Sequence, residues 1–141
     1  MTVVQTSRKT YPAKTAFVID ATRVDLQLEL GFGVSIIRPF LLDNVNFPWM
    51  RSADELDRRR AKEARHCLII LIGGKEVIAD VDDDRRRQLT VIVYLPVKKF
   101  GLPGTVVDVD GESCVCVNDY MNQLEISGFS PNLVKMHLNG V

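Results

Sequence analysis

The chain has 141 residues, of which 46% are hydrophobic and 26% charged, a composition typical of one globular domain with a sizeable core. Its 18 basic and 18 acidic residues cancel, which excludes a global electrostatic attraction to nucleic acid, membranes or acidic partners. The apolar run from Cys67 to Gly74 is far shorter than the roughly 20 residues that span a bilayer, and residues 1–10 lack a signal-peptide core. We therefore expect a cytoplasmic protein that is neither secreted nor bound to a membrane.

The three cysteines, Cys67, Cys114 and Cys116, are odd in number, and two cysteines in a C-x-C pair cannot easily bridge each other. We expect reduced thiols. A metal site made of Cys114, Cys116 and a histidine is the less favoured alternative, because zinc sites usually show C-x2-C spacing and four ligands.

Residues 14–30 alternate between apolar and polar in their second half, with Val24, Leu26, Leu28 and Leu30 expected on one face, which predicts a half-buried strand. The segment Gly31–Gly33 supplies a turn, because glycine takes positive φ at little cost, and residues 34–45 then return antiparallel to the first strand. Pro39 has no N–H to donate to a neighbouring strand, so it belongs at a sheet edge or a bulge.

The middle of the chain predicts a helix. Ser52 and Glu55 form an S-x-x-E capping box, which places the helix from about residue 53 to about residue 71. Gly73 and Gly74 then end it with a left-handed cap.

Residues 75–81 and 88–97 predict two further strands, which form a hairpin across the charged loop 82–87. Residues 98–116 contain turn signals, including Asp110-Gly111, and predict an inserted hairpin that either serves assembly or extends the sheet.

Near the C-terminus, Asn118 is expected to cap a short helix over residues 119–127 that Gly128 closes, and the residues that follow have no firm period. Together these elements make an α+β chain whose strands are numerous enough to close a small barrel. The expected organisation is an N-terminal arm (1–13), one domain (14–128, with the insertion at 98–116) and a C-terminal tail (129–141).

The order of segments resembles the staphylococcal-nuclease family. The resemblance rests on "IDATRVDLQLELGFGV" at residues 19–34, "RPFLLD" at 38–43, "RRRQLTVIVYL" at 85–95 and "VNDYMNQLEISGF" at 117–129. The "LGFG" turn is similar to that of phage-type homologues. The resemblance implies a five-stranded OB-fold barrel with two or three helices, to which the insertion adds an extra hairpin.

The family's site uses two aspartates and a backbone carbonyl to hold calcium, a glutamate to activate water and two arginines to clamp the phosphate. Hard cations prefer oxygen ligands, and the guanidinium fork matches two phosphate oxygens. By resemblance, Arg38 corresponds to the first arginine and Asp43 to a metal-binding aspartate. Arg87 corresponds to the second arginine, with Arg85 and Arg86 so close that the register between the three is open.

Two family positions depart from the pattern. The family's D-G-D-T becomes "DATR", so that Asp20 matches the first aspartate while the metal-binding second one falls on Thr22. The catalytic glutamate falls on Asn46, which cannot accept a proton. A general base contributes roughly 100 to 10,000-fold in rate, and the loss of a carboxylate weakens calcium binding. We therefore expect an impaired enzyme.

Simpler roles compete with these assignments. Asp43 also fits a turn cap, and the neighbouring aspartates blunt the attraction of Arg85 and Arg86 for phosphate. Trp49 fits either packing of its loop or a stacking platform for a nucleic-acid base.

The favoured hypothesis is an interaction or structural module, with a phage assembly component in the host cytoplasm or virion as one form of it. The alternatives are a divergent calcium-dependent nuclease acting on DNA or RNA, and a single-strand binder that uses Arg38, Arg87 and Trp49. No cofactor is expected unless the enzyme is active, in which case it is Ca²⁺. Because a polar N-terminus frays unless something ties it down, we also expect other protein subunits as partners.

Overall fold

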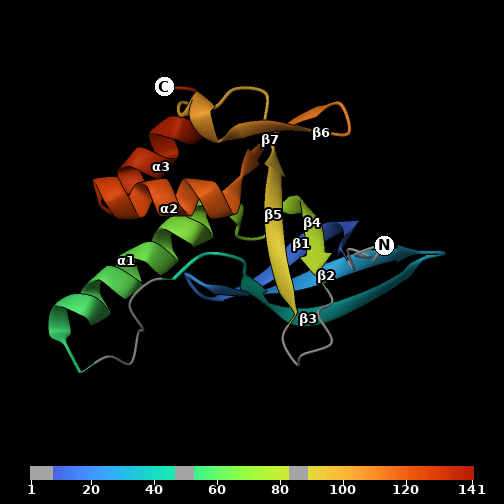
Figure 1. Ribbon diagram of the computed structural model, residues 1–141, viewed down its shortest axis with the longest axis horizontal. Helices are drawn as coiled ribbons and strands as arrows, with labels where there is room; N and C mark the ends of the chain where they lie inside the picture. Colours follow the sequence, from blue (N-terminus) through green and yellow to red (C-terminus); the bar gives the residue numbers. More distant parts are fainter. Residues whose placement is uncertain (1–7, 47–52, 83–88) are drawn as a thin grey trace, which may run out of the picture.

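The computed structural model describes residues 8–46, 53–82 and 89–141, and shows an α+β fold with a mostly antiparallel seven-stranded sheet and three α-helices (Figure 1). The α+β class expected from the sequence is confirmed. The strands are β1 (Arg8–Asp20), β2 (Arg23–Gly31), β3 (Val34–Leu42), β4 (Glu76–Asp82), β5 (Thr90–Pro96), β6 (Val106–Val109) and β7 (Glu112–Cys116). The helices are α1 (Glu55–Ile72), α2 (Val117–Ser127) and α3 (Pro131–Leu138), with a 3₁₀ turn at Pro103–Thr105.

Five of the strands form a ring. Their order is β3-β2-β1-β4-β5, and β5 pairs again with β3. Every pairing is antiparallel except this last one, which is parallel and short: Leu41 lies opposite Thr90, and Leu42 lies opposite Val91. The ring therefore closes through two residue pairs, and the hairpin β6–β7 continues the sheet from β5. The hairpin predicted at the turn Asp110-Gly111 is confirmed, and it extends the sheet.

The core follows the alternation of the strands. Val24, Leu26 and Leu28 are buried as predicted, and Leu68 and Leu71 of α1 join them in the same hydrophobic cluster. Leu30 was expected to share this buried face but is 42% exposed. The β2–β3 hairpin extends beyond the core, so the apolar end of β2 has no other described element packed over it (Figure 1).

The sequence predicted one strand over residues 14–30, whereas the structure has two. Asp20 accepts hydrogen bonds from the backbone N–H and the hydroxyl of Thr22, both at 2.8 Å, and so turns the chain between β1 and β2. This is the turn chemistry of a short polar side chain bonding the backbone two residues on. At the other end, β1 begins at Arg8, so residues 8–13 belong to the sheet and not to an arm; they pair with β4.

The helix ends are also corrected. α1 begins at Glu55 with Asp54 as its N-cap, because the Asp54 carboxylate accepts the Leu56 N–H at 2.9 Å. The predicted cap, Ser52, lies outside the described residues. Gly74 has a φ of 68°, which confirms the left-handed end. The C-terminal tail contains α3, which begins after an N-cap at Ser130 and packs against α1.

Asn118 does not cap α2, which begins at Val117 after Cys116. Its buried side-chain amide instead accepts the Val93 N–H at 3.0 Å and donates to the carbonyls of Val91, at 3.0 Å, and Asp43, at 2.9 Å. A buried backbone group must find a partner, and this amide supplies one to β5 and to the loop after β3. Asn118 therefore ties α2 to the place where the ring closes.

Replacing Asn118 with alanine is expected to lower the free energy of unfolding by about 3 kcal/mol, because the buried Val93 N–H loses its acceptor and two carbonyls lose a donor. The measurement is urea unfolding followed by circular dichroism. Asn122→Ala is the matched control, since Asn122 makes one exposed hydrogen bond, to the Asn44 carbonyl, and its loss should change stability by less than about 1 kcal/mol. Equal losses in both variants would contradict the role of Asn118.

Candidate functional site

The segments named by the resemblance meet at one end of the ring. The Leu42 N–H donates to the Thr22 carbonyl at 2.7 Å, which joins the β1–β2 turn to the end of β3. The Asp43 N–H donates to the Val91 carbonyl at 3.0 Å, which joins the end of β3 to the beginning of β5. The structure thus places Thr22 and Asp43, the two positions that the resemblance aligns with metal ligands, on adjoining segments.

Asp20 is engaged within its own turn. Besides the two bonds from Thr22, its carboxylate accepts from the Arg23 guanidinium, with Nε at 3.2 Å and Nη2 at 3.0 Å. Burial opposes ionisation of Asp20, but the bonds from Thr22 and the nearby Arg23 charge outweigh it and lower the pKa of Asp20 below its ordinary value of 3.8. This carboxylate is ionised at neutral pH and already paired.

Asp43 is engaged by a residue from the other end of β1. Arg8 Nη1 lies 3.7 Å from Asp43 Oδ2 and 3.6 Å from Asp82 Oδ2, and Arg8 Nε lies 3.2 Å from Asp80 Oδ1. The same guanidinium also donates to the Asp80 carbonyl at 3.2 Å. Arg8 is half-buried, with 27% of its side chain exposed, so water screens these pairs less than at an open surface. One guanidinium therefore lies within ion-pair distance of three carboxylates.

Positive charges already lie beside both aspartates that the resemblance names as metal ligands. A divalent cation bound by Asp43 would meet the Arg8 charge, and at Asp20 it would have to compete with Arg23. Within residues 8–46, 53–82 and 89–141, no group of three or more His, Cys, Asp or Glu residues is placed to hold a metal. Cys114 and Cys116 are buried and unpaired, and burial raises the pKa of the Cys116 thiol to about 11, which keeps it protonated.

Arg38 stands apart from this cluster. It lies on β3 opposite Leu26, four residues before Leu42, which is roughly 13 Å along an extended strand. Its side chain is exposed, and it makes no hydrogen bond or ion pair with another described residue. The phosphate contact expected of Arg38 stays a prediction.

Of the remaining residues that the sequence analysis named for the site, the structure describes only Asn46. Asn46 is exposed and follows a turn in which Asn44 has a φ of 59°. The other four expected residues lie outside the described residues: Trp49, Arg85, Arg86 and Arg87.

Two residues that matter to this site were missed in the sequence. Arg8 lay in the expected N-terminal arm, and only its register opposite Asp82 brings it to the acids. Asn118 holds the backbone of Asp43 but looked like a helix cap. The sequence gives no local signal for either role, because both depend on contacts more than 25 residues away along the chain.

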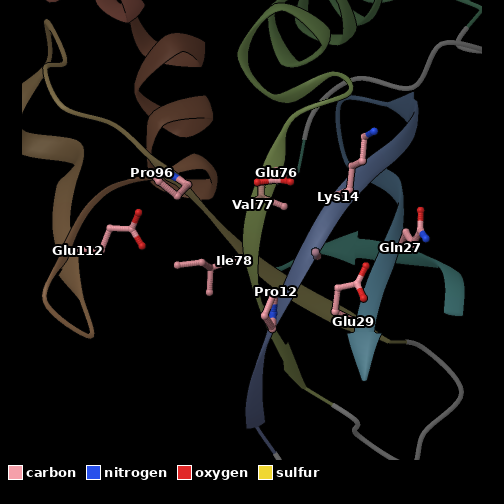
Figure 2. A pocket seen from close by; sticks show the side chains of 10 residues that line it. Pro12, Lys14, Gln27, Glu29, Glu76, Val77, Ile78, Pro96 and Glu112 are labelled. Carbon is pink, nitrogen blue, oxygen red and sulfur yellow. The ribbon is translucent and has the colours of Figure 1, made fainter. Parts of the chain in front are cut away.

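A hollow of about 530 Å³ lies elsewhere on the sheet (Figure 2). Its floor includes Pro12 and Ile78, and Glu112 lies on one side while Glu29 lies on the other, with Glu76 between them (Figure 2). Three carboxylates against one lysine would repel a phosphate backbone. The charge of this lining therefore disfavours binding of nucleic acid.

A scan against models of protein families finds no match to this chain, and a search of curated proteins finds none either. Among the described helices, none is both long and apolar enough to cross a bilayer.

Asp20→Asn is expected to lower stability more at neutral pH than at pH 3. The folded-state pKa of Asp20 lies below its unfolded value, so the ionised carboxylate stabilises the folded protein above the unfolded pKa, and this contribution fades as pH falls through the folded pKa. Urea unfolding of both proteins at each pH gives the comparison. A difference that is the same at pH 7 and pH 3 would show that the charge of Asp20 contributes nothing.

Proposed function

We propose that this chain is a staphylococcal-nuclease-like OB-fold protein that does not cleave nucleic acid and acts as an interaction module. The strand order supports the fold part of the proposal. An OB-fold is a five-stranded, partly open Greek-key barrel, and the five-stranded ring, with α1 between β3 and β4 in the chain, is consistent with that fold.

The observation that carries the functional part is the pairing of both candidate metal carboxylates with arginines. Arg23 holds Asp20, and Arg8 lies between Asp43 and two further aspartates. A guanidinium supplies the positive charge that such acids would otherwise obtain from a cation, and it brings no water to activate. Each of the two acids therefore has a positively charged partner within the chain.

The two replaced positions act in the same direction. Thr22 uses its hydroxyl to bond Asp20, and Asn46 has no proton-accepting carboxylate. Loss of a general base alone removes roughly 100 to 10,000-fold in rate. Combined with weakened metal binding, this loss leaves a folded domain that acts through the surface it presents to a partner.

The test is a cleavage assay on single-stranded DNA, double-stranded DNA and RNA, with calcium, magnesium or manganese compared with a chelator. The wild-type protein is expected to give the same background with and without metal. The variant Arg8→Met, Thr22→Asp, Asn46→Glu restores the two acids and removes the competing charge, so it is expected to gain calcium-dependent cleavage.

The control for this gain adds Arg38→Ala to the restored variant, which should lose the activity if Arg38 contacts the phosphate. Metal-dependent cleavage by the wild-type protein that disappears in Asp43→Asn would overturn the proposal and support a divergent nuclease.

A further inference from the structure

Among the described residues, the outer edge of β3 has no strand partner over most of its length. β3 pairs with β2 from Val34 to Leu41, but it pairs with β5 only at Leu41 and Leu42. The Leu42 N–H points to the β2 side, where it reaches Thr22, and the Leu41 N–H points to the β5 side, where it reaches Leu89 at 3.0 Å.

Backbone groups alternate along a strand, so every second residue before Leu41 faces the β5 side. The β2–β3 register runs without a shift from Leu41 back to Ser35, which keeps this alternation intact. Pro39, Ile37 and Ser35 therefore face outward. Pro39 has no N–H to offer, whereas Ile37 and Ser35 each present one N–H and one carbonyl without a strand partner among the described residues.

The same hairpin exposes large apolar side chains. Phe32, at the tip, is 106% exposed, and Ile37 is 59% exposed; Leu30, Val34 and Ile36 are exposed as well. Soluble proteins normally protect an open edge with charges, a covering element or a very short strand, because such an edge pairs readily with another strand. This edge is apolar from Val34 to Ile37 apart from Ser35, which is typical of a surface that has a partner.

The edge is complementary to itself. When two copies of β3 run antiparallel about a two-fold axis at Ile36, Ser35 of one copy lies opposite Ile37 of the other. These are the residues whose backbone groups face outward, so each N–H meets a carbonyl in both copies. Val34 then lies opposite Arg38 and Ile36 opposite itself, so no like charges meet, and the pairing ends at Pro39.

We propose that two copies of this chain associate by antiparallel pairing of their β3 edges, with the two-fold axis at Ile36. The interface is isologous, since the same patch serves both subunits, and the ladder of backbone hydrogen bonds joins the two sheets into one. The exposed apolar side chains of the hairpin add contact area beside the ladder. This inference rests on the proposed interaction role and names a second copy as the partner.

The experiment is sedimentation velocity over a range of concentrations. The wild-type protein is expected to pass from monomer to dimer as concentration rises. Ile36→Lys and Ile36→Glu each place like charges across the axis, so each is expected to raise the dimer dissociation constant by about tenfold or more. An equimolar mixture of the two variants should recover the dimer, because lysine then faces glutamate.

Val107→Lys is the matched control. Val107 is 38% exposed against 37% for Ile36, and it lies on β6, the opposite edge of the sheet. This variant should dimerise like the wild type. Ile37→Pro removes an outward N–H without touching the β2 pairing, and it should also weaken the dimer; circular dichroism and urea unfolding check that each variant folds.

A wild-type protein that stays monomeric at every concentration would overturn the inference, as would a dimer that Val107→Lys disrupts and Ile36→Lys does not. Failure of the Lys and Glu variants to recover a dimer on mixing would overturn the axis at Ile36. The outcome is separate from the cleavage assay: a dimer that cleaves nucleic acid refutes only the proposed function, and a silent monomer refutes only this pairing.

Discussion

The short parallel contact between β3 and β5 is the constraint on which the rest of the structure depends. Two residue pairs close the ring, and the buried amide of Asn118 supports them by bonding Val91 and Val93 of β5 and the Asp43 carbonyl. The amide satisfies backbone groups that the short ladder leaves over, and it fixes α2 against the same edge. The candidate site depends on this closure, because the backbone of Asp43 is positioned by its hydrogen bonds to Val91 and Asn118.

At that site, the chain provides its own positive charges. Arg8 reaches three aspartates across the β1–β4 ladder, and Arg23 closes the turn over Asp20. Charges that are paired within the chain cost less to bury than free carboxylates, so these pairs stabilise the fold while they oppose a cation. The internal pairs are therefore consistent with the proposal that this chain does not cleave nucleic acid. In that proposal, the unpaired β3 edge is the surface through which the protein acts.

The sequence predicted the features that depend on local pattern. The alternation in β2, the antiparallel pairing of β4 with β5, the hairpin at Asp110-Gly111 and the glycine end of α1 follow from residues close together in the chain. The features it missed depend on distant contacts or on competing uses of one residue type. Asn118 is a residue type that often caps helices, but here its side chain bonds the backbone of β5. The sequence around Arg8 has no strand pattern of its own, and the segment is a strand because it pairs with β4. Helix α3, which begins after Ser130, is too short to show a clear apolar period, so it was not predicted.

If internal arginines take the place of a metal at this site, as proposed, the wild-type protein should not bind calcium. The most direct measurement is a calcium titration of the wild-type protein and of the double variant Arg8→Met, Thr22→Asp. Binding is read out by isothermal titration calorimetry and by the change in thermal unfolding temperature. The account predicts no saturable heat and no change in unfolding temperature for the wild type, and a saturable rise for the variant. Saturable calcium binding by the wild type that Asp43→Asn abolishes would contradict it.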